Sequence, residues 1–422
     1  MLIRLFYTLL LALVAPLLLF GLYKSKPNKP KFGKRWKEHF GITPKLISNQ
    51  RPIWIHAVSV GESIAATPLI KEIKKQKPEQ SIVVTTTTST GAEQIEKLGS
   101  LVEHRYMPID FGFAVKGFLK AIQPKKMLII ETELWPNTLH QVSKFGVPIT
   151  VVNARLSQKS RNNYAKFQPF FNIIEPYLTK ILCQSQSDAD HFESLGVAKG
   201  KLAITGSIKF DIQIADTIKE KAKALRSELG EHRPIWIAAS THKGEDEQIL
   251  NAHKNVLKVY PDALLMIVPR HPERFDNVVQ LCQSSGFTTT RRTSADIESC
   301  EKSQVYVGDT MGEMLILIGA ADICFMGGSL IGDKVGGHNV LEPAALEVPV
   351  ISGPSYFNFS EIVNQLNSRN GIVITSTDNL SRTIGYYFSN FQERDILAKN
   401  AQQVVRANIG SIGKTIKQIQ SI

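Results

Sequence analysis

Polar side chains that could do chemistry follow three apolar runs in the first half of the chain. Ser59-Val-Gly-Glu-Ser63 places Glu62 where a helix would begin, and Glu131-Thr-Glu-Leu-Trp-Pro-Asn137 places two acids at a strand tip. A carboxylate at such a turn can act as a general base, or it can only complement a helix dipole. Gly206-Ser-Ile-Lys-Phe-Asp211 brings Lys209 to a third turn. From these residues alone, solvated loop acids and a surface lysine remain alternatives to a catalytic set.

Basic and glycine-rich turns in the second half indicate binding of an anion. Pro269-Arg-His-Pro-Glu-Arg274 is a compact basic turn, suited to a phosphate or a carboxylate. Gly308-Asp-Thr-Met-Gly-Glu313 is a strand-to-helix turn whose backbone amides can face an anion. The segment from Gly327 to Pro343 has five glycines in its first eleven residues and then a helix start. Its free N–H groups are expected to bind a phosphate. Glu342 could accept hydrogen bonds from ribose hydroxyls. It matches neither a Walker A loop nor Gly-x-Gly-x-x-Gly.

A basic and aromatic segment lies between residues 153 and 172. It contains Arg155, Lys159, Arg161 and Lys166 and no acid, interleaved with the aromatic residues Tyr164, Phe167, Phe170 and Phe171. Such a patch suits a membrane surface or an anionic amphiphile, although a solvated helix with an apolar core face explains it equally well. The four cysteines lie far apart and form no Cys-x-x-Cys pair, so neither a structural zinc site nor a disulfide framework is predicted.

The elements that must position these turns are short β-branched runs separated by helical patterns. Such near-continuous hydrophobic strands are typical of parallel sheets covered on both faces. The predicted strands are 53–59, 81–88, 127–133, 149–155, 181–185, 202–207, 234–240, 264–270, 305–310, 323–329 and 350–353. Ligands of such sheets bind outside the carboxyl ends of the strands, where the polar turns lie.

An internal echo indicates two similar halves. Arg51-Pro-Ile-Trp-Ile, which leads to Glu62, resembles Arg233-Pro-Ile-Trp-Ile, which leads to Glu245. Each copy would open a Rossmann-like, doubly wound domain with a buried first strand. The predicted domains are residues 50–210 and 233–422, facing a cleft, with a polar helix-forming linker at 211–232. The last helix is expected to pack back on the first domain.

The N-terminus is apolar and then basic. Leu5 to Tyr23 has no charge over 19 residues, long enough to match a hydrocarbon core. Seven basic residues follow between Lys24 and Lys37, which predicts a cytoplasmic catalytic part. We therefore expect a membrane anchor at 1–23 and a basic juxtamembrane segment at 24–49, in preference to a cleaved signal peptide. Residues 1–40 hold +7 of the net charge of +12, so no nucleic-acid surface is indicated elsewhere.

Taken together, the motifs resemble those of the 3-deoxy-D-manno-octulosonic acid (Kdo) transferases, which build the inner core of lipopolysaccharide. The resemblance runs almost end to end. The motifs that carry it are His56-Ala-Val-Ser-Val-Gly-Glu62, Glu131-Thr-Glu-Leu-Trp-Pro-Asn137, Asn153-Ala-Arg-Leu-Ser157, Gly206-Ser-Ile-Lys-Phe-Asp211, Val268-Pro-Arg-His-Pro-Glu-Arg-Phe275, Val307-Gly-Asp-Thr-Met-Gly-Glu313 and Gly336-Gly-His-Asn-Val-Leu-Glu342.

The resemblance implies a GT-B fold and an inverting transfer of Kdo from CMP-Kdo to a lipid A precursor, lipid IVA. It implies Glu62 as the general base, with Glu131 and Lys209 as transition-state stabilisers. It also implies a CMP site made by Pro269, Arg270, Met311, Gly312, Glu313, Asn339, Val340, Leu341 and Glu342. We expect no metal or other cofactor, because a single phosphate is a leaving group that basic and backbone groups can stabilise.

The implied location is the cytoplasmic face of the inner membrane. Arg155, Lys159 and Arg161 are then candidates to meet the acceptor or membrane lipids. Two other classes stay open from the sequence. One is a different GT-B enzyme, such as another nucleotide-sugar transferase or an epimerase. The other is an exported solute-binding protein, against which the lysine-rich flank argues.

Overall fold

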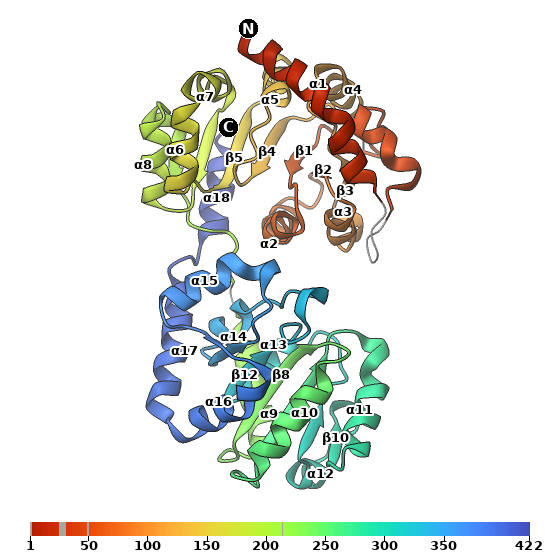
Figure 1. The fold of residues 1–422 in the computed structure, drawn as a ribbon, viewed down its shortest axis with the longest axis vertical. Helices are drawn as coiled ribbons and strands as arrows, with labels where there is room; N and C mark the ends of the chain where they lie inside the picture. The colour runs from red at the N-terminus through yellow and green to blue at the C-terminus, as the bar shows by residue number, and fades with distance from the viewer. Residues whose placement is uncertain (1, 25–30, 49, 213) are drawn as a thin grey trace. The chain divides into compact units, whose positions relative to one another are not determined.

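The chain forms two α/β units in the computed structural model, which describes residues 2–24, 31–48, 50–212 and 214–422 (Figure 1). One unit comprises Met1–Lys209 and Gly410–Ile422, and the other comprises Phe210–Ile409. Each unit contains a seven-stranded sheet, and all strand pairs are parallel. Helices cover each sheet on both faces. The predicted fold class, two Rossmann-like doubly wound units of the GT-B type, is confirmed.

The sheet of the first unit has the order β3-β2-β1-β4-β5-β6-β7. Its strands are β1 (Ile53–His56), β2 (Ile82–Thr86), β3 (Glu103–Tyr106), β4 (Lys126–Ile130), β5 (Ile149–Ala154), β6 (Lys180–Cys183) and β7 (Leu202–Ile204). Its helices are α1 (Leu2–Tyr23), α2 (Val60–Gln76), α3 (Ser89–Glu96), α4 (Gly112–Ile122), α5 (Pro136–Lys144), α6 (Gln158–Lys166), α7 (Gln168–Ile174), α8 (Gln186–Ser194) and α18 (Ser411–Gln420).

The sheet of the second unit has the order β10-β11-β9-β8-β12-β13-β14. Its strands are β8 (Ile235–Thr241), β9 (Leu264–Pro269), β10 (Thr289–Arg291), β11 (Val305–Val307), β12 (Ile323–Met326), β13 (Val350–Ser352) and β14 (Val373–Ile374). Its helices are α9 (Asp216–Leu229), α10 (Asp246–Leu257), α11 (Phe275–Ser284), α12 (Ile297–Lys302), α13 (Met314–Gly319), α14 (Leu341–Ala345), α15 (Ser360–Ser368), α16 (Thr377–Ser389) and α17 (Phe391–Arg406).

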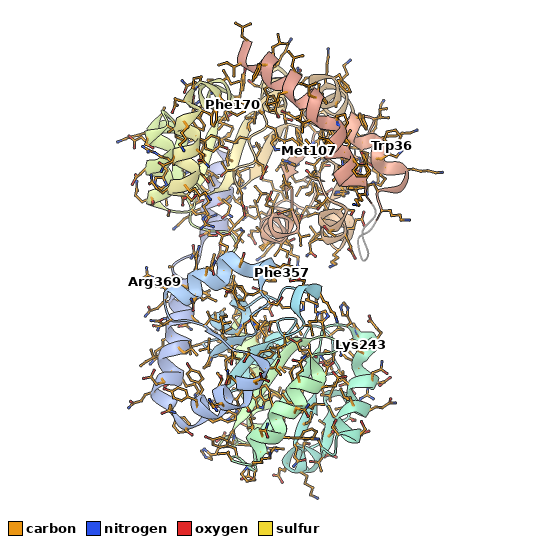
Figure 2. All side chains as sticks on the ribbon, in the orientation of Figure 1. Trp36, Met107, Phe170, Lys243, Phe357 and Arg369 are labelled. Carbon is orange, nitrogen blue, oxygen red and sulfur yellow. The ribbon has the colours of Figure 1, made fainter. Side chains whose placement is uncertain are left out.

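Alternate residues of the central strands enter different cores. On β1, Trp54 belongs to one apolar cluster while Ile53 and Ile55 belong to another. On β8, Trp236 and Ile237 are divided in the same way. Successive side chains of a strand point to opposite faces, so both sheets are buried on both sides. This explains why these strands read as continuous apolar runs. Figure 2 shows side chains filling both units.

Each of the eleven predicted strands has a counterpart in the sheets, shorter in most cases than the apolar run suggests. Three strands are missing from the prediction: β3, β10 and β14. All three are edge or near-edge strands. Their sequences are polar or only two residues long, as in Glu103-His-Arg-Tyr106. An edge strand needs less apolar burial, so the hydrophobic pattern carries no signal for it.

The predicted linker at 211–232 is wrong in its main part. Residues 216–229 form α9, which lies inside the second unit. Ala222, Leu225 and Leu229 are buried in that unit's core, and Arg226 forms a salt bridge with Asp322 at 3.1 Å. The polar face of α9 hides a three-residue apolar stripe at helical spacing, which overall composition does not reveal.

The C-terminal helix α18 belongs to the first unit, which confirms the expectation that the last helix packs back on the first domain. Ile412, Ile416 and Ile419 enter the core beneath α2. The Lys126 Nζ donates a hydrogen bond to the carbonyl oxygen of Ile419, at 2.6 Å. The chain therefore returns to its first unit after completing the second.

Helix α1 is long and apolar enough to cross a membrane, and none of its residues is buried. It contacts α5 and α7 of the first unit: Thr8 Oγ1 accepts a hydrogen bond from Asn137 Nδ2 at 2.9 Å. Of the basic segment 24–49, residues 25–30 and 49 lie outside the described residues. Within the described part, Gly33–Phe40 is a 3-10 helix whose Arg35 binds Glu38.

Candidate active site

Glu62 lies in the first turn of α2, just after β1, where the family resemblance implies a general base. Ser59 caps α2: its Oγ accepts a hydrogen bond from the Glu62 N–H at 3.3 Å and donates one to Glu62 Oε1 at 2.8 Å. The Val58 N–H donates to Oε2 at 2.7 Å. Glu62 therefore takes part in an arrangement like a capping box at the start of α2, in which its carboxylate binds the Val58 N–H and the Ser59 hydroxyl. This helix-capping role is compatible with a catalytic one.

The environment of Glu62 makes it a proton acceptor near neutral pH. Its side chain is buried, and this burial raises its pKa to about 7 against the two hydrogen bonds, which lower it. The negative charges of Glu131 and Glu133 raise it further. A carboxyl group with a pKa near the working pH is well matched to general-base catalysis.

Glu131 and Lys209 form an ion pair in the first unit. Glu131 Oε1 and Lys209 Nζ are 2.5 Å apart, and the lysine side chain is only 13% exposed. Glu131 follows β4 directly, while Lys209 follows β7 by five residues. The structure thus brings together two of the predicted site residues that are 78 positions apart in sequence. The surface-lysine interpretation of Lys209 is wrong.

Two non-glycine residues of this site have left-handed backbones. Glu131 has a φ of 63° and Asn153, at the end of the neighbouring strand β5, a φ of 57°. Such conformations cost about 1–3 kcal/mol each and cluster at functional sites. Asn153 is fully buried, and its Oδ1 accepts a hydrogen bond from the Ile208 N–H at 3.1 Å, next to Lys209. The sequence gives Asn153 no role beyond its motif, and its position at a strand end is the signal that marks it.

Trp135 and His56 line the same group of turns. The Trp135 Nε1 donates to Glu133 Oε2 at 3.2 Å, and the Trp135 ring meets the His56 ring edge-on at 5.3 Å. His56 Nδ1 lies 3.0 Å from Thr85 Oγ1. Burial lowers the pKa of His56 to about 4, so this imidazole is neutral at pH 7. It packs against Trp135, which is consistent with a structural role.

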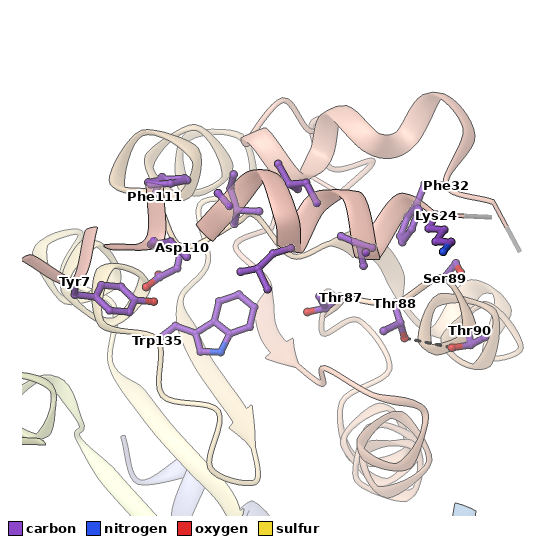
Figure 3. A pocket seen from close by; sticks show the side chains of 17 residues that line it. Tyr7, Lys24, Phe32, Thr87, Thr88, Ser89, Thr90, Asp110, Phe111 and Trp135 are labelled. Carbon is purple, nitrogen blue, oxygen red and sulfur yellow. Dashed lines mark hydrogen bonds between the residues drawn. The ribbon is translucent and has the colours of Figure 1, made fainter. Parts of the chain in front are cut away.

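A cavity of about 560 Å³ opens beside these turns in the first unit (Figure 3). One wall is the apolar face of α1, including Leu11, Leu18 and Leu22. The opposite rim is polar, with Thr87 to Thr90 and Asp110, and it reaches Trp135. A second cavity of about 750 Å³ lies on the other flank of α1, against Tyr164, Phe167 and Phe170 of the basic aromatic segment. Helix α1 therefore borders two apolar cavities.

The basic residues of the segment are divided around this second cavity: Lys166 of α6 lines it, whereas Arg155, Lys159 and Arg161 do not. Arg155, which precedes α6, and Lys159 are exposed, and Arg161 is half-buried with its Nε donating to Ser194 Oγ at 2.9 Å. The aromatic partners are divided: Phe171 is fully buried and Phe167 is 69% exposed. The segment is thus neither a purely solvated face nor a purely apolar one.

In the second unit, the basic turn after β9 has two parts. The Arg274 side chain donates to the Thr241 carbonyl oxygen at 2.7 Å and forms an ion pair with the buried Asp246. It holds the turn in place and is not available to a ligand. Arg270 and His271 are exposed at the end of the strand. Of the predicted basic turn, Arg270 and His271 therefore remain as candidates to bind an anion.

The turn 308–313 is stabilised by arginines from another element. Glu313 forms a salt bridge with Arg292 at 3.2 Å and accepts a hydrogen bond from Thr310 Oγ1 at 2.6 Å. Arg292, with the Thr310 bond, holds the pKa of Glu313 below its usual range. Gly312 has a φ of 84°, which favours glycine. Met311 is 65% exposed, so it projects from the strand ends.

The glycine loop after β12 was expected to offer free N–H groups to a phosphate, and this expectation is wrong for its first amides. They are bound by a carboxylate of the protein. Glu245 is fully buried and accepts hydrogen bonds from the N–H groups of Gly328, Ser329 and Leu330, at 2.7–3.0 Å. The His242 N–H adds a longer one at 3.3 Å. These amides are not free to bind a phosphate. The sequence could not show this, because Glu245 is 82 residues from the loop.

The end of the loop presents Asn339 and Glu342. Asn339 Oδ1 accepts a hydrogen bond from the Leu341 N–H at 3.2 Å, and its Nδ2 donates to Glu342 Oε1 at 3.3 Å. Burial raises the pKa of Glu342. Val340 and Leu341 are buried in the core, so only their backbone atoms can meet a ligand. The described residues contain no group of three or more His, Cys, Asp or Glu side chains suited to a metal ion.

Comparisons with known proteins agree with this arrangement. The family described as 3-deoxy-D-manno-octulosonic-acid transferase (kdotransferase) matches residues 34–212, and glycosyl transferases group 1 match residues 233–404. A 3-deoxy-D-manno-octulosonic acid transferase of Haemophilus influenzae is 39% identical over 417 residues, covering 98% of this chain and 97% of the relative. The enzyme of the same name from Rickettsia felis is 34% identical, covering 84% and 76%.

One solved structure is similar over the second unit. It is described as the C-terminal CMP-Kdo binding domain of WaaA from Acinetobacter baumannii. It is 34% identical, covers 46% of this chain and all of that chain, and has a TM-score of 0.43.

Proposed function

The chain belongs to the Kdo transferases, and we propose that it moves Kdo from CMP-Kdo to lipid IVA with inversion at the transferred carbon. The transferase class follows from the relatives, while the sugar donor, the acceptor and the stereochemistry belong to the proposal. The observation that carries it is Glu62, a buried carboxyl group with a pKa of about 7 at the carboxyl edge of a parallel sheet.

Glu62 acts as the general base in this proposal. An acceptor hydroxyl donates its proton to the Glu62 carboxylate as its oxygen attacks the anomeric carbon of Kdo. Ser59 and the Val58 N–H orient the carboxylate, so little reorganisation is needed when the proton arrives. Attack opposite the leaving phosphate gives inversion.

Lys209 and Glu131 stabilise the charge that changes during transfer. The sugar donor carries two anionic groups, the phosphate and its own carboxylate, and a lysine with 13% exposure offers a strong positive field. Glu131 fixes the ammonium group through their 2.5 Å contact. No metal ion takes part in this scheme. We therefore expect that treatment with EDTA leaves the transfer rate unchanged.

The second unit binds the cytidine monophosphate part of the sugar donor. Arg270 meets the phosphate, the backbone of Met311 to Glu313 borders the base, and Asn339 and Glu342 accept the ribose hydroxyls. The exposure of Arg270 and Met311, and the linked Asn339–Glu342 pair, support this assignment.

The acceptor lies against the first unit at the membrane. Lipid IVA carries acyl chains and phosphates, and α1 borders an apolar cavity whose rim reaches Trp135, next to Glu133. Arg155, Lys159 and Arg161 would meet the phosphates of the acceptor or of membrane lipids. Helix α1 anchors the protein in the inner membrane, and the lysine-rich segment after it places both units in the cytoplasm.

The test is CMP release by the full chain in detergent, supplied with freshly made CMP-Kdo. The reaction is run with and without tetraacylated lipid A precursor, and the lipid product is weighed by mass spectrometry. We expect release that depends on the lipid, together with a gain of whole Kdo units.

Folded protein and intact CMP-Kdo that give no lipid-dependent release would overturn the proposed sugar donor and acceptor. Transfer from a UDP-sugar in preference to CMP-Kdo would do the same. The anomeric configuration of the product, read by NMR, decides inversion separately.

A further inference from the structure

Three histidines converge at one edge of the second sheet. His242 follows β8, His271 follows β9 and His338 lies in the glycine loop after β12. The strand β8 pairs with both β9 and β12, so these turns are neighbours. His242 Nε2 and His338 Nε2 are 2.8 Å apart, with ring planes within 9° of parallel. The rings of His242 and His271 meet edge-on at 5.3 Å.

The two paired imidazoles are held by a rigid frame. Glu245 binds the His242 N–H and three N–H groups of the glycine loop. Gly328 has a φ of 71°, and a β-carbon there would stand 3.0 Å from Cδ2 of His338. The ring of His338 therefore rests directly on glycine backbone. The frame fixes both histidines before any ligand arrives.

The short contact between the Nε2 atoms fixes the proton count of the pair. One of these nitrogens must carry a hydrogen and the other must accept it. In the neutral pair, only one Nδ1 carries a hydrogen. One further proton keeps the Nε2 contact and makes both Nδ1 atoms donors. A second proton would set two N–H groups against each other. The pair can thus gain one proton and become a cationic double donor.

The surrounding charges keep this pair neutral in the free protein. Burial, with the neighbouring His242 and the positive charge of Arg270, lowers the pKa of His338 to about 3. Burial, with the neighbouring His271 and the positive charges of Arg274 and Arg270, lowers the pKa of His242 to about 4. Glu245 is linked to the pair through the His242 N–H, and its oxygens are already engaged by four N–H groups. An anion that bound beside the pair would raise both pKa values, since opposite charge favours the protonated form.

We propose that the His242–His338 pair binds a phosphate oxygen of the cytidine monophosphate group and takes up one proton when that group binds. The inference rests on the proposed function, because it takes the second unit as the nucleotide site. The loop amides that would otherwise bind a phosphate are occupied by Glu245, and α14 has only five residues. The histidine pair supplies the missing hydrogen-bond donors, next to Arg270.

The test is calorimetry of CMP binding to the full chain in detergent at pH 7.5. Titrations in buffers of different ionisation enthalpy report the protons exchanged per CMP bound. We expect an uptake of about one proton, because the singly protonated pair is the binding form. Cytidine, which lacks the phosphate, should bind with no uptake. A titration with free Kdo, which carries a carboxylate but no phosphate, is the second control and should also show no proton uptake.

Two variants locate the proton. His338→Gln and His242→Gln keep a polar side chain but cannot take up a proton. Each should abolish the uptake and weaken CMP binding by about ten- to a hundredfold, as expected for loss of a hydrogen bond to a charged group. His232→Gln is the matched control, because His232 is an exposed histidine of the same unit; it should bind as the wild type does. Thermal unfolding checks that each variant is folded.

The outcomes separate the inference from the proposal beneath it. CMP binding without proton uptake, or uptake that persists in both variants, would overturn the histidine pair and leave the nucleotide site standing. Uptake with Kdo but not with CMP would overturn the phosphate assignment. A folded wild-type protein that binds no CMP at all would overturn the nucleotide site and the inference together.

Discussion

Glu62 and Glu245 stand at matching places in the two units. Each follows the repeated sequence Arg-Pro-Ile-Trp-Ile, Glu62 by seven residues and Glu245 by eight, and stands at the start of the helix after a strand whose tryptophan is fully buried. Glu62 receives hydrogen bonds from two groups of its own turn, Val58 and Ser59. Glu245 receives bonds from four backbone N–H groups, three of them on a distant loop.

This difference teaches how to tell a reactive carboxylate from a structural one. Burial alone does not distinguish them, because both side chains are buried and burial raises the pKa of both. The number of hydrogen-bond donors to each carboxylate distinguishes them. Glu245 has its oxygens occupied by the loop it organises, whereas Glu62 retains acceptor capacity beside two further carboxylates. A similar strand and turn thus carries the proposed general base in one unit and a scaffold in the other.

The largest expected effect comes from removing the reactive carboxylate. Glu62→Gln keeps the shape and the cap partner but cannot accept a proton at neutral pH. We expect kcat for Kdo transfer to fall by about 10²–10⁴-fold, the usual contribution of a general base. CMP affinity, measured by calorimetry, should stay within about twofold of the wild type.

Glu79→Gln, an exposed position after α2, controls for the loss of one charge and should transfer normally. If Glu62→Gln retained the wild-type kcat, Glu62 would not be the general base, and the two glutamates would not differ in catalytic role.

Removing the structural carboxylate should act on stability first. Glu245→Gln sets an amide group against N–H donors that now meet a carboxylate. We expect the free energy of unfolding to fall by about 2–4 kcal/mol, since bonds to a charged group are worth about 1.5–3 kcal/mol each and unmet donors add a penalty. Chemical denaturation followed by tryptophan fluorescence measures it.

Glu247→Gln changes an exposed glutamate of the same helix and should leave the unfolding midpoint in place. An unaltered midpoint in Glu245→Gln would mean that the four N–H groups find other partners. Glu245 would then differ from Glu62 in its hydrogen bonds but not in its contribution to stability.

The places of the two glutamates in the fold could be predicted from the sequence, because local patterns mark them. The echo located both central strands, and each glutamate follows a strand end where ligands of parallel sheets bind. Glu62 is a local feature: its partners lie within four residues. Eleven strands carried enough apolar residues to be read. The three polar or very short ones did not.

The rest depends on contacts between distant segments. Nothing near Gly328 in sequence indicates that its N–H meets Glu245, and nothing near Lys209 indicates Glu131. Asn153 acts through a left-handed backbone and a bond to Ile208, neither of which a residue type reveals. The polar face of α9 likewise concealed its packed side. Long-range pairing decides all four, and local propensity carries no information on it.

The pH dependence should separate the two glutamates more finely. The pKa of Glu62 is raised to about 7, so the carboxyl group is protonated below that pH and cannot serve as a base. We expect kcat/KM for the acceptor to fall about tenfold per pH unit below pH 7 and to level off above it. Initial rates between pH 5.5 and 8.5, with CMP-Kdo stability checked at each pH, measure the profile.

In Glu62→Gln the residual rate should lose this acid limb, while Glu247→Gln should keep it. An acid limb that persists unchanged without Glu62 would assign the titration to another group.

The smallest expected effect concerns the surface of the first unit and tests whether its exposed basic residues bind the acceptor. Arg155→Ala combined with Lys159→Ala removes two exposed charges from the first unit. We expect KM for lipid IVA to rise about three- to tenfold, because each solvent-exposed charge contributes up to about 1 kcal/mol. KM for CMP-Kdo should not move, since its proposed site belongs to the second unit. Steady-state kinetics with each substrate varied in turn gives both constants.

Lys97→Ala combined with Lys199→Ala removes the same charge from exposed positions of the same unit outside α6, and it controls for overall charge. If both pairs raise KM for the lipid equally, the unit attracts the acceptor through its total charge, and α6 is an ordinary solvated helix. If only the α6 pair acts, the first unit recognises its substrate through a local surface, just as the second is proposed to do through its histidines. The reactive carboxylate would then have a docking surface of its own, matched to the acceptor rather than to the nucleotide.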